Sequence, residues 1–587
     1  MGVPSQESSA AIDVDLVAAQ FDALDSDTHR SALLEAIRAR DVYRKLVEKL
    51  QEDLEKLKRG LIGPTTQRFK TENDLQLSMQ ILVELLGRTD VSGADAKQLA
   101  EQLAAQAQAE AEALAGARDD GDGPNEGGEH RRKRKSTGRK TAREDLPKVT
   151  VELLPDEVKR LGTDAFERIG EETSTTIERR ISALVEVTVV RPKFRAKTSD
   201  AVAAVQGERG IDGSPAQDVP EAWITIAPPA ELPIERGIAG PGLLANVIVR
   251  RFDDHLPYNR LENVYEREGM RLGRSTLYGW LDALRPLFAP LLAAMLTDAR
   301  ELPYVCIDAT GVLVQAPEQC SRGHFWVLVA PGRHVIFAFS RTHDKEAVDT
   351  LLEGYEGYIV ADAHAVYDHL YGDGGATEVG CWGHARAYVF KTLSSEPEIA
   401  RQFLGNLQVM FMLERKFADK PRKQRERMRA SKVKVLVDRH FALCRQHEAT
   451  ALEGTPLAAA IRYSLNQEGA LRRFLGDGRL PATNNISERM ARRQAIGRNN
   501  WLFVGSDDGA EVNTTFASLI ASCHMHGIEP EAYLRDVLCL MPAWPKSRVL
   551  ELAPCNWHQT REQPDAQQRL AANLFRAAVL ELDSVHA

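Results

Sequence analysis

GDGRLPATNNISERMARRQAIGRNNWLFVGS, residues 476–506, combines a helix start with a carboxylate and a row of arginines. Asn484 and Asn485 are favourable N-cap residues, and apolar residues recur after them at helical spacing. The stretch therefore predicts a helix with Glu488 in its first turn, where the helix dipole favours a carboxylate. The plainer interpretation is a surface helix in which Glu488 pairs with Arg492 one turn later.

Two further carboxylates each end a short, β-rich apolar run. Residues 304–308 read YVCID and residues 357–362 read GYIVAD, so Asp308 and Asp362 end predicted strands. An Asp at this place is otherwise a common turn or cap residue. Together with Glu488, these acids on separate elements suit a two-metal phosphoryl-transfer site, because carboxylate oxygens hold Mg²⁺ or Mn²⁺ beside the attacking and leaving oxygens.

The order of elements between the two aspartates predicts an α/β core. Asp308 is followed by three β-rich runs separated by Pro and Gly turns, a predicted helix, and the strand that reaches Asp362. An antiparallel meander, a crossover helix and a further strand form the plan of the ribonuclease-H-like nuclease and transposase fold. There the first and fourth strands are neighbours, so we expect Asp308 and Asp362 to lie side by side. The runs span residues 311–316, 324–330 and 334–340, and the helix spans residues 344–352.

Long motifs recur through the second half of the chain. They are residues 238–281 (beginning IAGPGLLAN), 307–315 (IDATGVLVQ), 361–370 (ADAHAVYDHL), 380–390 (GCWGHARAYVF), 474–511 (containing ATNNISERMARR) and 528–538 (IEPEAYLRDVL). In sequence and order these motifs resemble bacterial insertion-sequence transposases of family sixty-six, the TnpC type, which carry a DDE catalytic triad. The resemblance covers roughly residues 228–557.

The resemblance implies a DNA transposase that binds the ends of an insertion sequence and catalyses metal-dependent strand cleavage and strand transfer. Asp308 would be the first catalytic Asp, Asp362 the second and Glu488 the closing Glu, and all three would hold two Mg²⁺ or Mn²⁺ ions. The implied partners are double-stranded DNA, as terminal repeats and as target, and two small companion proteins. A catalytically silent DNA-binding regulator and a nuclease that cleaves without joining are the alternatives.

Several residues depart from the family pattern. Ala309 follows the first Asp where relatives have Glu, Ala363 and His364 follow the second where relatives have Gly-Tyr, and Thr483 replaces an Asp before the two asparagines. All three carboxylates are retained. Relatives also carry a zinc region rich in CxxC pairs, whereas the first cysteine here is Cys306. We therefore expect no zinc and interpret residues 146–227 as a degenerate equivalent of that region.

The N-terminal part of the chain is predicted to be helical and then basic. We expect residues 1–27 to be disordered and residues 28–62 to form a coiled coil, because a heptad seam runs through them. A coiled coil implies a homodimer or higher oligomer; a single amphipathic helix is the alternative. Residues 63–118 continue as a helical segment. Residues 119–145 form a linker whose cations could hold DNA phosphates: Arg131, Arg132, Lys133, Arg134 and Lys135.

The remaining domains follow from helical spacing and the catalytic motifs. Residues 228–300 resemble a helix-turn-helix region in which Arg274, Ser275 and Thr276 open the groove-reading helix, although an ordinary helical connector fits too. The catalytic core takes residues 301–383 and 476–510, interrupted by an inserted helical subdomain at residues 384–475, and a helical region follows at residues 511–587. The whole is a multidomain α and α/β protein.

Other side chains near the triad are candidates for DNA contact or for auxiliary roles. Arg489, Arg492, Arg493 and Arg498 follow Glu488 on its predicted helix. His364 could orient the nucleophile or a phosphate, and Cys381 with His384 forms a lone CxxH that favours a structural role over metal binding. Trp501 could stack on bases or belong to the core.

Composition restricts the class of protein. The 587 residues, 43% of them apolar, suffice for several domains. The sequence shows neither a signal peptide nor an apolar run near eighteen residues, so we expect no membrane partner and a cytoplasmic, nucleoid-associated protein. A net charge of −9 opposes DNA binding as a whole, but local basic stretches decide phosphate contact; residues 415–445 carry twelve Lys and Arg against three acids.

Overall fold

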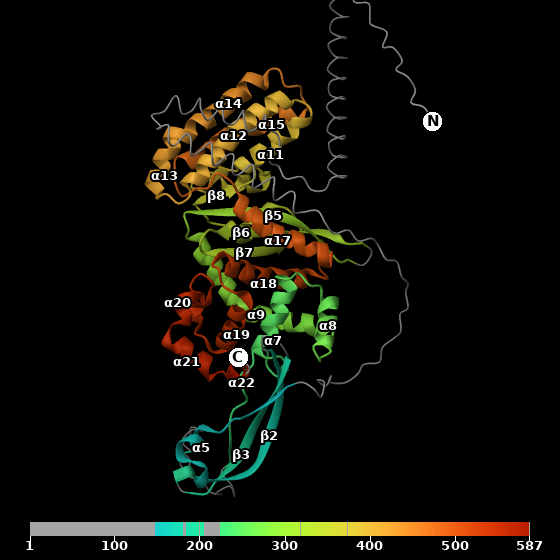
Figure 1. The fold of residues 1–587 in the computed structure, drawn as a ribbon, viewed down its shortest axis with the longest axis vertical. Coiled ribbons are helices and arrows are strands. Elements are labelled where there is room, and N and C mark those ends of the chain that lie inside the picture. Colours follow the sequence, from blue (N-terminus) through green and yellow to red (C-terminus); the bar gives the residue numbers. More distant parts are fainter. Residues whose placement is uncertain are drawn as a thin grey trace, which may run out of the picture. The chain divides into compact units, whose positions relative to one another are not determined.

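The computed structural model describes residues 147–179, 184–198, 200–202, 204, 224–316, 319–372 and 374–585. The predicted disordered segment, coiled coil, helical segment and basic linker, with Arg131 to Lys135, lie outside these residues. The described chain forms two compact units, one of residues 379–483 and one of residues 147–378 and 484–585. The first unit consists mainly of helices, and the second has helices around β-sheets (Figure 1).

A five-stranded sheet with the order β7-β6-β5-β8-β9 forms the centre of the second unit. The first three strands form an antiparallel meander, α10 crosses over, and β8 then pairs with β5 in parallel. The predicted adjacency of the strand of Asp308 and the strand that leads to Asp362 is therefore confirmed. The prediction that Asp308 ends its strand is wrong, because the runs at residues 304–308 and 311–316 form one continuous strand that pairs with β6. The elements are β5 (Tyr304–Val314), β6 (Ser321–Ala330), β7 (His334–Ser340), α10 (Lys345–Leu352), β8 (Tyr358–Ala361) and β9 (Thr377–Gly380).

Helices cover this sheet and protect its edge. α17 (Asn485–Trp501) lies along β5 and β6, and α18 (Asp507–Met525) lies along the edge strand β7 (Figure 1). The N–H groups of Val335 and Phe337 on β7 donate to Ser522 Oγ (3.0 Å) and Ser518 Oγ (2.8 Å) of α18. The edge that would otherwise present unpaired donors is thus closed by side chains.

Four further helices complete the main core of this unit: α7 (Pro241–Phe252), α8 (Tyr258–Arg267), α9 (Arg274–Arg300) and α19 (Pro530–Leu540). Among the described residues, α9 is the one helix long and apolar enough to cross a membrane by length and composition. The sequence analysis did not anticipate such a helix. Leu277, Leu284, Phe288 and Leu291 on one side of α9 are completely buried in the core, which accounts for its apolar composition.

Shorter helical elements follow toward the C-terminus: α20 (Trp557–Arg561), α21 (Pro564–Ala572) and α22 (Leu574–Val585). Phe575 and Ala578 of α22 pack against Val185, Val187 and Val189 of the N-terminal sheet. The C-terminal residues therefore help to hold that sheet within the same unit.

The N-terminal sheet is built around one long strand, β3 (Leu184–Ala196). It pairs in parallel with β1 (Lys148–Glu152), and antiparallel with β2 (Phe166–Arg179) and β4 (Ile224–Ile226). α5 (Asp156–Leu161) precedes β2. A small apolar cluster fixes the end of this sheet: Val158, Phe166, Phe194 and Ala201. This is the region expected to replace a zinc site, and its described part is organised by apolar packing.

The sequence GPG at residues 240–242 packs closely against a buried carboxylate on β2. Glu178 is 2% exposed and accepts hydrogen bonds from the N–H groups of Leu243 (2.8 Å) and Arg179 (2.7 Å). A Cβ at Gly240 or Gly242 would lie 2.2 or 2.4 Å from the carboxylate oxygens. Only glycine allows this approach, so the motif that opens α7 also anchors the N-terminal sheet.

Glu178→Gln should reduce the pH dependence of unfolding. Burial raises the folded-state pKa of Glu178 to about 8 from its ordinary value of 4.5, against the effect of the donating backbone N–H groups. Its stabilising contribution is complete below pH 4.5 and is lost as pH rises through about 8, with a slope of at most about 1.4 kcal/mol per pH unit. Urea midpoints measured across this window should vary less for Glu178→Gln than for the wild type. The exposed control Glu356→Gln should retain the wild-type slope, and equal slopes in all three proteins would contradict the assignment.

The unit of residues 379–483 is a helical bundle entered through the end of β9. Val389, Phe403, Leu404 and Ile461 are buried in its core. A π-helical turn between α13 and α14 carries the fully buried Arg429. The helices are α11 (Trp382–Lys391), α12 (Pro397–Phe417), α13 (Arg422–Met428), α14 (Lys434–Glu448), α15 (Pro456–Asn466) and α16 (Glu468–Arg472).

Candidate active site

The two aspartates stand level on neighbouring strands of the second unit. β5 pairs with β8 in parallel, and the last pair in register is Cys306 with Val360. Asp308 and Asp362 each lie two residues beyond that pair, Asp308 within β5 and Asp362 directly after the end of β8. Neighbouring strands lie about 4.8 Å apart. Both side chains are half-buried.

Burial and the charges of both aspartates raise the pKa of one tyrosine. Tyr367 is 2% exposed and lies in the short 3-10 helix that follows Asp362. Burial raises the pKa of its hydroxyl group well above the usual range, and the charges of Asp362 and Asp308 raise it further. One hydroxyl group therefore lies within electrostatic range of both carboxylates, as the strand register requires.

Asn484 ties the helix of Glu488 to the strand of Asp308. Its side-chain Nδ2 donates to the carbonyl oxygen of Ile307 (2.7 Å), the residue directly before Asp308. Ser487 Oγ donates to the Asn484 carbonyl oxygen (2.9 Å), and so does the N–H of Glu488 (3.2 Å). α17 begins at Asn485, as predicted. The expected side-chain cap is absent, because the Asn484 Oδ1 that would accept a backbone N–H accepts from Ser487 Oγ instead.

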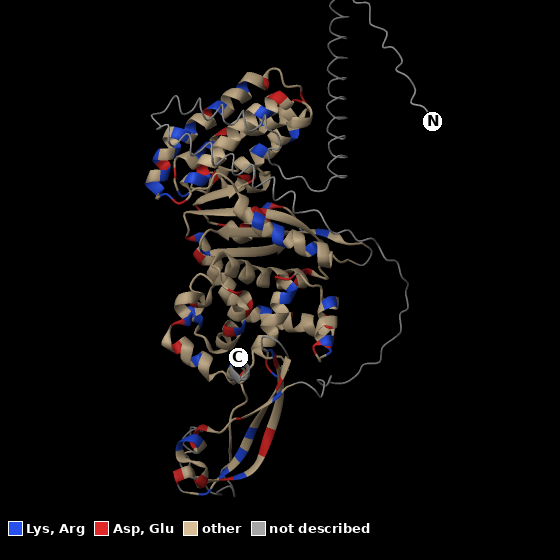
Figure 2. Ribbon diagram, viewed as in Figure 1, with Lys and Arg blue, Asp and Glu red and all other residues tan. Residues whose placement is uncertain are grey.

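The arginines of α17 divide into two pairs. Arg498 donates to Thr310 Oγ1 (3.2 Å) and to the carbonyl oxygen of Gly311, while Arg493 forms an ion pair with Asp253. These two side chains hold α17 within its own unit. Arg489 and Arg492 are exposed, and no ion pair of theirs is seen within the described part of the chain. Figure 2 shows the basic residues along this helix.

Trp501 belongs to the core. It is 9% exposed, packs with Val312, Phe325 and Val504, and has the guanidinium of Arg251 5.5 Å from its ring centroid. Of the two interpretations of this residue, base stacking and core packing, the structure has the second. The exposed aromatic side chain at this end of α17 is Phe503, which is 40% exposed.

His364 belongs to a group of rings that the sequence analysis did not detect. Its Nδ1 accepts from the N–H of Val366 (3.2 Å), and its ring centroid lies 4.5 Å from that of His343. His343 in turn stacks on Trp326 (4.7 Å) and lies 4.8 Å from His324. Burial lowers the pKa values of His324 and His343. These histidines come from three separate segments, so no sequence spacing links them.

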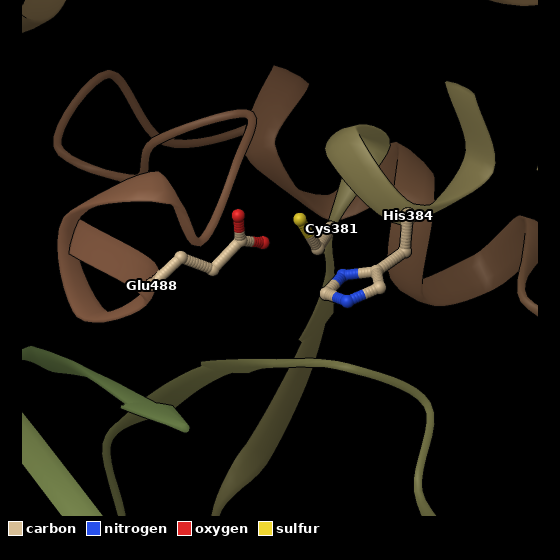
Figure 3. A group of neighbouring side chains, drawn as sticks. All are labelled: Cys381, His384 and Glu488. Atoms are coloured by element: carbon tan, nitrogen blue, oxygen red, sulfur yellow. The ribbon is translucent and has the colours of Figure 1, made fainter. Parts of the chain in front are cut away.

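Cys381 and His384 lie at the start of α11, in the helical unit. Figure 3 draws both side chains, together with Glu488, which belongs to the other unit. Cys381 is buried and His384 is half-buried. The N–H of Trp382 donates to the carbonyl oxygen of Ala482 (3.0 Å), so this helix start is fixed to the segment that leads out of the unit.

The predicted groove-reading residues open α9. Arg274 and Ser275 are exposed and Thr276 is half-buried, with Arg274 Nε 3.2 Å from Glu262 Oε2 of α8. α8 and α9 are joined by a six-residue connection, 268–273. The arrangement is therefore helix, turn and helix; groove reading by this helix stays a prediction.

The basic stretch of the helical unit is partly neutralised from within. Arg425 and Arg429 pair with Glu414, and Arg422 pairs with Glu426. The exposed Lys and Arg residues that remain on α13 and α14 are interspersed with acids (Figure 2). DNA contact by this surface stays a prediction.

Comparison with known proteins agrees with the motifs. A family model described as Transposase IS66 family matches residues 236–512, and a model described as IS66 C-terminal element matches residues 518–555. The uncharacterized protein y4hP of Sinorhizobium fredii (strain NBRC 101917 / NGR234) is 26% identical over 540 residues, which are 86% of this chain and 88% of the relative. The uncharacterized protein y4qI of the same strain is 29% identical over 398 residues, 64% of this chain and 70% of the relative. The two family models together match more than half of the residues, in the order that the motifs indicated, and the chain belongs to the IS66 family of transposases.

Proposed function

We propose that this chain is a DDE transposase that binds the ends of an insertion sequence and catalyses metal-dependent DNA strand cleavage and strand transfer. The observation that carries the proposal is the parallel pairing of β5 with β8, because Asp308 and Asp362 each follow its last pair by two residues. The hydrogen bond from Asn484 to Ile307 adds the helix of Glu488 to the same place. The strand order of the sheet also supports a ribonuclease-H-like core.

The donor set fits divalent ions that prefer oxygen ligands. Asp308, Asp362 and Glu488 offer carboxylate oxygens, and two Mg²⁺ or Mn²⁺ ions held by them would stabilise the charge on the attacking and leaving oxygens. Ala309 and Ala363, where relatives have larger or more flexible residues, add neither charge nor hydrogen-bond donors beside the aspartates. The departures therefore retain all three carboxylates.

The protein's own side chains would fix the reacting groups. The buried Asn484 and Ser487 hold the first turn of α17, and Arg498 holds its last turns against β5. The carboxylate of Glu488 would therefore be held in a fixed position relative to the aspartates. Such positioning lowers the activation barrier of the reaction. Water, and then the freed 3′-hydroxyl group, would be the successive nucleophiles, with no covalent protein intermediate.

The partners in this proposal are duplex DNA and further protein copies. Arg489 and Arg492 would contact phosphates next to Glu488, and the start of α9 would read the terminal repeat. The coiled coil of residues 28–62 would join two chains. Companion proteins of the same element would act with the assembled complex.

Metal binding tests the carboxylate site directly. In calorimetric titration of the full chain with MnCl₂, we expect saturable binding for the wild type and its loss in the double variant Asp308→Asn/Glu488→Gln. The matched control Asp164→Asn/Glu356→Gln replaces one exposed Asp and one exposed Glu away from the triad and should bind as the wild type does. Absence of binding to the wild type, with and without duplex DNA, would refute the two-metal function.

A further inference from the structure

The turn after α17 exposes apolar side chains that the fold does not use. Eight large apolar side chains are exposed among the described residues, and four of them lie here: Leu313 (48%), Ile496 (48%), Leu502 (64%) and Phe503 (40%). Val504 follows this turn and forms a bridge with β5, since its N–H donates to the Leu313 carbonyl oxygen (2.9 Å). The bridge brings Leu313 to the same end of the sheet as the turn.

The backbone of the turn is strained at its most exposed residue. Leu502 has φ 64° and ψ −50°, in the left-handed region that costs an L-residue free energy. The N–H of Leu502 donates to the carbonyl oxygen of Arg498 (2.7 Å), and the N–H of Phe503 donates to the carbonyl oxygen of Trp501 (2.8 Å). Because Trp501 and Val504 are buried on either side, the two exposed side chains are presented from fixed backbone.

The face of α17 that leads to this turn is cationic and polar. Its exposed residues recur at spacings of three and four, namely Asn485, Arg489, Arg492, Ile496 and Asn499, and Asn500 follows the last of them. The acids that follow the turn are engaged elsewhere, since Asp507 pairs with Arg341, and Glu511 with Arg285. The exposed face thus combines positive charge at its start with an apolar tip at its end.

We propose that the Leu502–Phe503 turn is a wedge that inserts between base pairs of the transposon-end duplex. The inference rests on the proposed function and adds how the DNA is bound. Apolar side chains flanked by cations are the means by which minor-groove proteins unstack a base step, while Arg side chains contact the phosphates. The charge of Arg489 and Arg492 on the same face favours DNA over a second protein copy as the occupant.

The length of α17 fixes where the wedge acts. Glu488 and Leu502 are fourteen residues apart along the helix, which corresponds to about 21 Å at 1.5 Å per residue. For a duplex lying along this face, that distance is about six base pairs at 3.4 Å each. The wedge therefore unstacks a step about six base pairs from the cleaved phosphate, on the side where α17 ends.

Fluorescence of 2-aminopurine, which rises when the base is unstacked, tests the wedge without cleavage. The probe is a duplex carrying the terminal sequence of the element that encodes this chain, with 2-aminopurine at successive positions, in the absence of divalent ions. With the full-length wild type we expect the signal to rise near the sixth base pair. Leu502→Gly/Phe503→Ser should bind the duplex and lose that rise, and glycine suits the left-handed backbone, so this variant keeps its fold. The control Leu161→Gly, an exposed leucine at the end of α5, should retain it.

The other results separate the wedge from its alternatives. Arg489→Gln/Arg492→Gln should lower the slope of log K against log salt by about two. An equal rise with the wild type and Leu502→Gly/Phe503→Ser, or no rise with a duplex that is bound, would overturn the wedge while leaving the transposase function intact. A change of oligomeric state in Leu502→Gly/Phe503→Ser without DNA would assign the patch to a second copy of the chain, and would also overturn it. Absence of DNA binding by the wild type would refute the proposed function itself.

Discussion

Asp308→Asn, Asp362→Asn and Glu488→Gln should each stop cleavage and joining of transposon-end DNA while leaving DNA binding unchanged. In the proposed function the three carboxylates form one site, which the β5–β8 pairing and the Asn484 hydrogen bond support, so each should be needed. We expect losses of at least ~100-fold in rate, the size seen when one group that stabilises transition-state charge is removed. Gel assays of strand nicking and of joined products, with end binding measured in parallel, provide the test.

The amide substitutions keep side-chain size and change only charge and ligand strength. Asp164→Asn and Glu356→Gln, exposed acids of the same unit, should retain wild-type rates. Unchanged joining by Asp308→Asn would refute the assignment of the triad. Nicked ends that never become joined to target, in the wild type itself, would favour a nuclease. Binding without any nicking would favour a silent regulator.

Much of the α/β core could be predicted from sequence because its signals are local. Alternating apolar residues and Pro or Gly turns indicated the meander, and the crossover rule then made β5 and β8 neighbours. Asp308 and Asp362 are separated by the same 54 residues as the last pair in register, Cys306 with Val360, and each lies two residues beyond it. Glu488 was predicted in the first turn of α17 from helical periodicity, and it lies there.

The sequence did not reveal which side of α17 faces inward. The four arginines of α17 have the same chemistry: Arg489, Arg492, Arg493 and Arg498. Their spacing does not reveal that Arg493 pairs with Asp253 or that Arg498 donates to the Gly311 carbonyl oxygen. Asn484 illustrates the same limit: its local preference is to cap a helix. Instead, its Nδ2 donates to a carbonyl of a strand 177 residues earlier, and its Oδ1 accepts from Ser487 Oγ. Such contacts depend on tertiary neighbours that local spacing does not encode.

Arg429→Met should destabilise the helical unit by about 3–5 kcal/mol, the range found when one partner of a buried ion pair is removed. Arg429 is completely buried, and its Nε and Nη2 donate to Glu414 at 2.9 and 2.7 Å. The remaining capacity of its guanidinium is used by backbone carbonyl oxygens, at 2.8 Å for both Asp477 and Leu480. Methionine would fill much of the volume but remove two donors from Glu414, which keeps Arg425, and the donors of these carbonyl groups. Each lost donor costs free energy.

The expected result is a lower urea midpoint for the helical unit. Circular dichroism and proteolysis within residues 379–483 would monitor its unfolding. Arg427→Met, an exposed arginine two residues earlier on the same turn, should unfold as the wild type does. The consequence for catalysis follows from chain order, because Leu480 lies four residues before Asn484. Loosening the segment that Arg429 holds frees the chain that enters α17, so cleavage should fall with stability and recover on cooling. An Arg429→Met protein with the wild-type midpoint would show that Glu414 and the carbonyl groups find water or other donors, and that the buried arginine is dispensable to this unit.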